Sequence, residues 1–191
     1  MSLFSEVWSS RNSGAQFSHD RQYRYRLWRC WGDPGKRVAF IGLNPSTADE
    51  HKDDPTIRRC IGFAKRWGFG AYEMLNLFGW RSTDPRGLLE PADPVGLGTQ
   101  HMTFHTAVQC ELVVLAWGSH ARLRKLIRAR LATLDLPAVP TIVLGLSKDG
   151  SPRHPLYLPY DTPRLNAASV RSADIDLLPN RPPYLSKGDL Q

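Results

Sequence analysis

The chain has 191 residues, 41% of them hydrophobic and 23% charged, which is enough for one globular domain with a buried core. Its 25 Lys and Arg exceed its 18 Asp and Glu, and the net charge of +7 favours an anionic partner such as nucleic acid. The three cysteines are odd in number and far apart, which argues against a disulfide framework or a four-cysteine metal site and favours a cytoplasmic protein. No apolar run approaches the ~20 residues of a membrane span.

The N-terminal part is expected to hold an arm followed by a hairpin. Residues 1–18 show no period and are expected to form a loosely ordered arm. Residues 23–31 are rich in aromatics and alternate with period two, and a Gly-Asp-Pro-Gly turn separates them from the apolar strand 38–43, which predicts a hairpin. Arg24 and Arg26 are expected on one face of the first strand, either solvated or as phosphate contacts.

Helices and strands then alternate. Asp54-Pro55 is typical of a helix start, with Asp as N-cap and Pro at the first position, and Gly68 or Gly70 is expected to end this helix. A Gly- and Pro-rich loop covers 79–98, and Ser119 is a suitable N-cap. The remaining predicted elements are strands at 72–78, 112–117 and 141–146 and helices at 100–109 and 120–134.

This order predicts an α/β fold. We expect a three-layer sandwich with a central, mainly parallel four-stranded sheet, plus an N-terminal edge hairpin strand. A single domain is expected over 19–160, with a Pro-rich C-terminal tail, 161–191, wrapping it. The protein is expected to be a monomer.

Polar residues follow each of the four parallel strands. Asn44 lies in Gly42-Leu43-Asn44-Pro45-Ser46, and the later strands are followed by Asn76, Ser119 and His154. Because the carboxyl ends of parallel strands share one edge, where ligands bind in open α/β sheets, these residues are predicted to form one site.

Each candidate also has a structural interpretation. His154, held by the following proline, can donate to a developing anion or cap its own loop. Asn44 can hold a water or a substrate edge, or bond its own turn. Asn76 can recognise the amide edge of a ring or satisfy neighbouring backbone, while Phe78 and Tyr157 can stack on a ring or pack in the core.

No metal or cofactor is expected. The pair His101 and His105 has helical i,i+4 spacing but lacks the Glu of a zinc protease motif. Nucleophile elbow, P-loop and dinucleotide fingerprint are all missing from the sequence.

Six motifs between about residues 22 and 160 together resemble the domain-of-unknown-function family 1643. They are Arg26-Leu27-Trp28, Ile41-Gly42-Leu43-Asn44-Pro45-Ser46-Thr47-Ala48, Asp54-Pro55-Thr56-Ile57-Arg58-Arg59, Asn76-Leu77-Phe78, Ala116-Trp117-Gly118 and His154-Pro155-Leu156-Tyr157.

The motif order also resembles the uracil-DNA glycosylase superfamily. The stretch around Asn44 is similar to Gly-Ile-Asn-Pro-Gly of its mismatch-specific branch, where the Asn positions the attacking water. Asn76 falls where the superfamily has a base-recognising Asn. Residues 115–121 are similar to Leu-Leu-Trp-Gly-Ser-Tyr-Ala, and His154 falls where a His stabilises the leaving base. This resemblance implies a uracil-DNA glycosylase-like fold.

Two departures accompany the resemblance. Leu156 replaces a Ser that contacts the DNA backbone in the superfamily. Because no Asp-Pro-Tyr-His motif occurs, the carboxylate that activates water is assigned to Asp49, with Glu50 as the alternative.

The resemblance implies a DNA glycosylase that hydrolyses the N-glycosidic bond of a flipped uracil or modified pyrimidine. The alternatives are an inactive nucleic-acid-binding module and an enzyme acting on free nucleosides or nucleotides. Asn44, His154 and Asp49 are the expected catalytic residues. Substrate contacts are expected from Gly42, Pro45, Ser46, Asn76, Phe78 and Tyr157. Contacts with DNA are expected from Ser119, His120, Arg122, Arg124, Lys125, Lys148 and Arg153.

Overall fold

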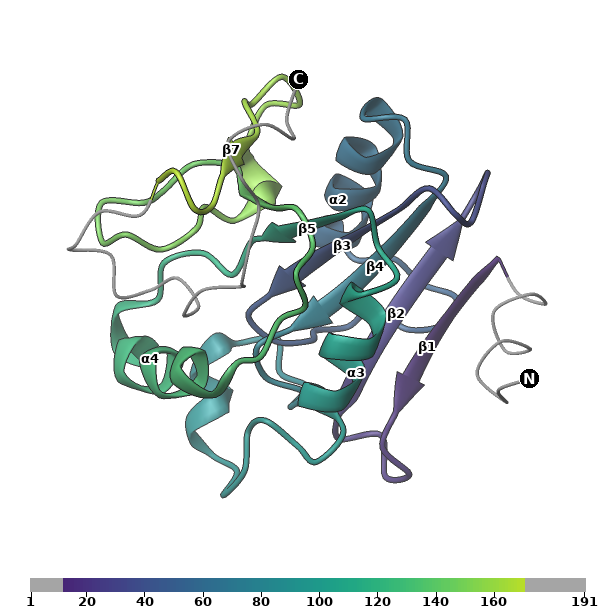
Figure 1. Cartoon of the computed structure of the whole chain (residues 1–191). Helices are drawn as coiled ribbons and strands as arrows, with labels where there is room; N and C mark the ends of the chain where they lie inside the picture. Colours follow the sequence, from purple (N-terminus) through teal and green to yellow (C-terminus); the bar gives the residue numbers. More distant parts are fainter. Residues whose placement is uncertain (1–11, 171–191) are drawn as a thin grey trace.

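The computed structural model describes residues 12–170, and within this range the chain forms one seven-stranded sheet with helices packed against it (Figure 1). The strands are β1 (Ser13–Phe17), β2 (Arg24–Cys30), β3 (Arg37–Gly42), β4 (Ala71–Asn76), β5 (Leu112–Leu115), β6 (Thr141–Val143) and β7 (Leu165–Asn166). The α-helices are α2 (Pro55–Arg66), α3 (Thr99–Ala107) and α4 (Arg124–Thr133), and the 3-10 helices are η1 (Pro85–Leu89), η2 (Ala121–Leu123) and η3 (Pro155–Tyr157).

The central sheet is mainly parallel, as predicted. Its strand order is β1-β2-β4-β3-β5-β6-β7, and the four strands β4, β3, β5 and β6 run parallel to one another. The outer strands are antiparallel, with β2 beside β4, β1 beside β2, and β7 beside β6. The mixed α/β class and the parallel centre are therefore confirmed.

Helices cover both faces of the sheet, and β3, β4 and β5 are therefore buried on both sides. On one face, Ile57, Phe63 and Ala64 of α2 pack into a core with alternate residues of the strands. On the other face, α3 and α4 contribute to a second core, which contains Ile127 and Leu131.

The predicted hairpin between the first two long strands is wrong, because β2 pairs with β4 instead of β3. A buried ion pair joins these two strands. Nε and Nη2 of Arg26 donate to the two carboxylate oxygens of Glu73 at 2.7 and 2.8 Å, and Glu73 is only 1% exposed. Arg37 of β3 approaches the same carboxylate at 3.6 Å, so one acidic group links three strands.

Arg24 and Arg26 are both buried, so neither is solvated or placed as a phosphate contact. They also point to different sides of the sheet, because a bulge interrupts the alternation of β2. Gln16 of β1 pairs with Arg26, but the next residue, Phe17, pairs with Arg24 and skips the residue between them. Arg24 consequently donates from Nη1 to the carbonyl of Ala48, 2.9 Å away, in the loop after β3.

The two terminal segments contribute edge strands. Residues 13–17, expected in the N-terminal arm, form β1 instead, and residues 1–11 lie outside the described range. In the segment expected as a tail, β7 pairs with β6, and 171–191 lie outside the described range.

Helix α2 starts as predicted, whereas α4 does not. Oδ1 of Asp54 caps α2 by accepting from the Ile57 amide at 2.8 Å. After β5 the short helix η2 intervenes, so α4 begins at Arg124 and Ser119 is not its N-cap. The Ser119 hydroxyl instead donates to Oδ2 of Asp149 at 2.6 Å, which joins the loops after β5 and β6.

The segment after β6 is fastened to α2. Nη2 of Arg59 donates to the Leu158 carbonyl, and its guanidinium lies 3.8 Å from the centre of the Tyr160 ring. Arg66, two turns further along α2, lies 4.5 Å from the centre of the same ring. We call Arg59, Arg66, Leu158 and Tyr160 the α2 clamp.

Replacing Glu73 by Gln is expected to destabilise the fold by about 3–5 kcal/mol, because it leaves the buried Arg26 charge without its counter-ion. Urea unfolding measures the change. The control is Glu111→Gln, an exposed site where the change is expected to stay within about 0.5 kcal/mol. Equal effects of the two substitutions would contradict a stabilising role for the buried pair.

Candidate functional site

The connections of the parallel strands reverse direction between β3 and β5. From β3 the chain passes through α2 to β4 on one side, and from β5 it passes through α4 to β6 on the other. The connecting helices cover opposite faces, so the loops after β3 and β5 diverge at the carboxyl edge. Such a switch point is where open α/β sheets bind ligands.

The side chain of Asn44 is fixed at this edge. Its Nδ2 donates to the carbonyls of Pro45 at 3.1 Å and of Ser82 at 2.9 Å, while the Ser82 amide donates to the Pro45 carbonyl at 2.9 Å. These bonds join the loops after β3 and β4. Because both amide hydrogens are engaged, Oδ1 is the atom of Asn44 that can accept from a bound molecule.

Asn76 ends β4 directly beside Gly42. It is 1% exposed, and among the described residues neither its Nδ2 nor its Oδ1 has a hydrogen-bond partner. Any side chain at Gly42 would collide, since a Cβ there would lie 2.5 Å from Met74 Cε and 3.1 Å from Asn76 Oδ1. Asn76 points to the same face as Met74, which is the α2 face.

Two histidines meet at Gly118, after β5. A Cβ on Gly118 would lie 3.1 Å from Cβ of His154 and 3.5 Å from Nε2 of His120, and its φ of +75° also favours glycine. The Gly118 amide donates to the Pro152 carbonyl at 2.9 Å, which brings the loop carrying His154 to the end of β5. The carboxylate of Asp54, at the start of α2, lies close enough to act on the His154 charge.

The environment keeps His154 neutral with a defined tautomer. Burial, followed by the nearby charge of His120, lowers its pKa below the ordinary 6.5, and Asp54 opposes this only in part. Its Nδ1 accepts from the Leu156 amide at 3.3 Å, so the proton of the neutral ring is on Nε2. His120 also carries a proton on Nε2, because this atom lies 2.9 Å from the Trp117 carbonyl, which can only accept.

The loop between β3 and α2 is held by arginines that the sequence did not associate with it. Arg29 donates to Asp53 at 2.9 Å and to the Asp49 carbonyl at 2.8 Å, and Arg21 makes two 2.9 Å bonds to Glu50. Oδ1 of Asp49 accepts from the amides of residues 51 and 52, and these bonds lower its pKa. The Asp49 carboxylate therefore shapes its own turn.

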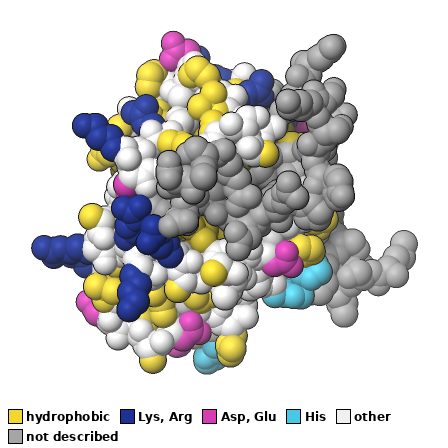
Figure 2. All heavy atoms as spheres, turned by 60° about the vertical axis from the view of Figure 1, so that its left-hand side comes forward, with side chains coloured by type: hydrophobic (Ala, Val, Ile, Leu, Met, Phe, Trp, Pro, Cys, Tyr) yellow, Lys and Arg dark blue, Asp and Glu magenta, His cyan; other side chains and the backbone are white. Residues whose placement is uncertain are grey.

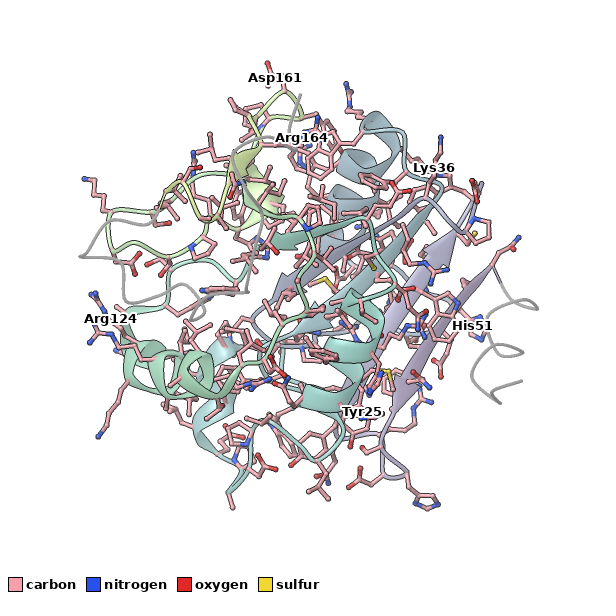
Figure 3. The ribbon with its side chains drawn as sticks, viewed as in Figure 1. Tyr25, Lys36, His51, Arg124, Asp161 and Arg164 are labelled. Carbon is pink, nitrogen blue, oxygen red and sulfur yellow. The ribbon has the colours of Figure 1, made fainter. Side chains whose placement is uncertain are left out.

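This turn extends toward β1. Glu50 and His51 line a hollow together with residues 12–15, and Figure 3 shows His51 beside β1 and β2, away from Arg124 on α4. Glu50 and His51 thus lie on the β1 side of the fold, whereas His120 and His154 follow β5 and β6.

The two expected aromatic contacts differ in their exposure. Phe78 is completely buried in the core on the α3 and α4 face, which corrects its expected role in stacking on a ring. Tyr157 is 87% exposed on η3, three residues after His154. Tyr157 is therefore not a core residue, and its ring is open to solvent.

A pocket of about 340 Å³ opens next to Asn44. Two arginines, four hydroxyl side chains, a glutamine and an indole form its wall. They are Arg21, Gln22, Ser46, Thr47, Trp80, Arg81, Ser82 and Thr83.

The expected basic residues lie on the surface at the same end of the fold. Arg122 is close enough to Asp84, the cap of η1, for its charge to add to the larger effect of the Arg86 hydrogen bond in lowering the pKa of Asp84. Figure 2 shows Lys and Arg side chains gathered on this side of the molecule, and Arg124 points away from α4 into solvent in Figure 3. The exposed expected residues are Ser119, Arg122, Arg124, Lys125, Lys148 and Arg153.

Arg130, which belongs to the same basic stretch, is instead a buried structural residue. Its Nε donates to the Leu77 carbonyl at 2.8 Å and its Nη2 to Gln100 at 2.8 Å, which fastens α4 to the end of β4 and to α3.

Residues 12–170 contain no cluster of three or more His, Cys, Asp or Glu side chains arranged to hold a metal ion. Across the same residues, no helix has the length and apolar character that crossing a bilayer requires.

Replacing His120 by Gln is expected to raise the pKa of His154, because it removes the neighbouring positive charge that disfavours protonation. ¹⁵N NMR titration of the imidazoles measures this pKa, with His101→Gln on α3 as the control. In the wild type the lowered pKa makes the contribution of His154 to stability complete above about pH 6.5, and it is lost as the pH falls through the lowered value. An unchanged titration of His154 in His120→Gln would refute the coupling.

No curated protein and no solved structure is similar to this chain at a significant level. A family model does match, and its match runs from residue 24 to residue 156, from β2 through η3. The matched stretch covers well over half of the chain and includes Asn44, Asn76, Gly118 and His154. The chain therefore belongs to the DUF1643 family, which is described as a protein family of unknown function.

Proposed function

We propose that this protein is a DNA glycosylase that hydrolyses the N-glycosidic bond of a flipped uracil or modified pyrimidine. The observation that carries the proposal is the side-chain amide of Asn76, which is buried at the carboxyl edge with no partner among the described residues. Burying an unsatisfied polar group costs about 1–3 kcal/mol, so such a group in a native protein requires an explanation.

A ligand with a complementary amide edge provides that explanation. An Asn side chain offers one acceptor and two donors in a plane, and the ring of a pyrimidine offers the matching carbonyl and N–H or amino group. Asn76 lies on the α2 face of the sheet, where Asp54 and His154 also approach. A base bound at Asn76 would therefore lie on the same side as the imidazole.

His154 supplies the group that bond cleavage requires. As the glycosidic bond breaks, its electron pair leaves with the base, and the sugar becomes oxocarbenium-like. The Nε2–H of the neutral imidazole can donate to the developing anion, because Nδ1 is already bound to the Leu156 amide.

Asn44 is the residue proposed to place the water. With Nδ2 held by two carbonyls, its Oδ1 can accept from a water and direct the oxygen lone pair toward the sugar C1′. Addition of the water to C1′ releases one proton to solvent, and the departed base anion takes up one proton from solvent, which gives the abasic sugar and the neutral free base. Asp49 stays a prediction as water activator, although its Oδ1 is bound within its own turn.

The DNA partner is supported by the position of the basic residues. Because η2 directly follows β5, Arg122 and the first turn of α4 stand at the carboxyl edge and not behind the sheet. This placement favours a polymeric substrate over a free nucleoside.

The test is incubation with duplex and single-stranded oligonucleotides that carry uracil, a thymine mismatch, or hydroxymethylated or glucosylated cytosine, followed by detection of abasic sites. His154→Gln is expected to lower turnover by about 10²- to 10³-fold with little change in binding, because one preorganised donor is removed. His101→Gln is the matched control. Tight, salt-sensitive binding without abasic product from any substrate would favour the inactive binding module instead.

The Asn76→Leu variant tests whether the side-chain amide of Asn76 serves substrate binding or the stability of the fold. Leu has the same number and branching of side-chain heavy atoms as Asn and removes two unpaired polar atoms, so the melting temperature is expected to stay the same or rise, while excision is abolished. Asn166→Leu in β7, where Oδ1 accepts from the Ala168 amide at 2.8 Å, is the control and is expected to leave excision unchanged. Strong destabilisation by Asn76→Leu would show that the amide is structural.

A further inference from the structure

We propose that the pocket beside Asn44 binds a phosphate group, and that in the substrate this is the backbone phosphate next to the excised nucleotide. This inference rests on the proposed function for the identity of the substrate. The phosphate site itself is carried by the charges and hydroxyl groups of the pocket.

The first observation that supports a phosphate site is the positive charge of Arg81. Arg81 lines the pocket, half-buried, and forms no ion pair with any carboxylate among residues 12–170. Its Nη1 donates to the Arg21 carbonyl at 2.9 Å, and its buried Nε has no partner within that range. Arg21, which also lines the pocket, is already paired with Glu50. The net charge of the pocket therefore comes from Arg81.

A second unpaired arginine lies behind the pocket. Arg24 is 2% exposed, and its only side-chain hydrogen bond within the described residues is the one to the Ala48 carbonyl. Burial lowers its pKa to about 10, and the nearby charge of Arg81 contributes to the same shift, while Tyr72 and Asp54 oppose it. Two arginines that repel each other without a bridging carboxylate are stabilised by a bound anion.

The remaining wall suits phosphate and an attached nucleoside. The hydroxyls of Ser46 and Thr47 can each donate to a phosphate oxygen, whereas the Ser82 hydroxyl already donates to the Asp84 carbonyl at 2.7 Å. The indole of Trp80 provides a surface on which a base or sugar can stack. Ser82 is also the residue whose carbonyl holds Asn44. A phosphate in this pocket would therefore lie beside the contact between Ser82 and Asn44 that positions Oδ1 of Asn44, the atom proposed to bind the water.

This site would lie apart from the basic residues of η2 and α4. The pocket is formed by the loops after β3 and β4 and by residues 21–22, whereas Arg122 and Arg124 follow β5. The DNA strand would then cross the carboxyl edge of the sheet between Arg81 on one side and Arg122 and Arg124 on the other. Phosphates on both sides of the flipped nucleotide would be held, which is the arrangement that fixes its register.

The experiment measures binding of a fluorescent thymine-only single-stranded oligonucleotide, which has no base to excise, by anisotropy over a series of KCl concentrations. Arg81→Gln is expected to weaken binding and to reduce the magnitude of the salt slope by about one. Thr47→Glu places a carboxylate in the pocket from an exposed position and is expected to weaken binding about tenfold or more. It leaves the Arg81 contacts in place, so it tests the site even if Arg81→Gln does not fold.

Two controls match these variants in charge. Arg86→Gln removes an exposed arginine that is paired with Asp84 and lies outside the pocket, and Gln109→Glu adds an exposed carboxylate at the end of α3. Both are expected to bind nearly as the wild type does. Competition by thymidine 5′-monophosphate or by inorganic phosphate, lost in Thr47→Glu, would support the same site and show that it also takes a free phosphate group.

The inference fails if both pocket variants fold and bind the oligonucleotide as tightly as their controls. Because the oligonucleotide carries no excisable base, this result does not depend on glycosylase activity. Conversely, absence of excision from every substrate, together with loss of binding in Thr47→Glu, would overturn the proposed function and leave the phosphate site intact.

Discussion

The ion pair between Arg26 and Glu73 is the interaction on which the rest of the structure depends. Glu73 lies at the centre of β4, and burial raises its pKa even though Arg26 and Arg37 favour its ionised form. A buried carboxylate must find its cations, and here they come from the two strands that flank β4. The pair thereby fixes β2 against β4. Once β2 is in this position, Arg24 and Arg29 reach the loop between β3 and α2 and hold it at the carboxyl edge.

The parallel centre of the fold was predictable from the sequence, but its antiparallel half was not. Apolar runs such as 112–117 identify strands that are buried on both faces, and Asp54-Pro55 marks a helix start through local chemistry alone. The pairing of β2 depends on a contact between residues 26 and 73, which no local turn signal reveals. The Gly-Asp-Pro-Gly turn predicts a reversal of the chain and does not specify the neighbouring strand. The bulge in β2 also interrupts the two-residue alternation from which the faces of this strand were predicted.

For the site, the sequence indicates the edge better than the chemistry of each residue. Asn44, Asn76 and His154 follow strands, and the topology gathers their loops at the carboxyl edge. The sequence allows Phe78 either to stack on a ring or to pack in the core, and in the fold its side chain lies in the core. The lowered pKa of His154 and the unpaired state of the Asn76 amide depend on burial and on which groups the folded chain brings near these side chains. Such properties follow from three-dimensional packing, so composition and spacing do not contain them.

The α2 clamp has a mechanical consequence for the site. The loop that carries Asn44 leads directly into the N-terminus of α2, and Arg59 ties the segment after His154 to the same helix. If Asn44 and His154 act as proposed, a small rigid-body movement of α2 would carry both of them together, while Asn76 stays with the sheet. Such a movement would alter the alignment of Asn76 with a bound base before it altered the separation of Asn44 from the imidazole. Substitutions within the α2 clamp, for example at Tyr160, would then shift this alignment without a change at Asn44, Asn76 or His154.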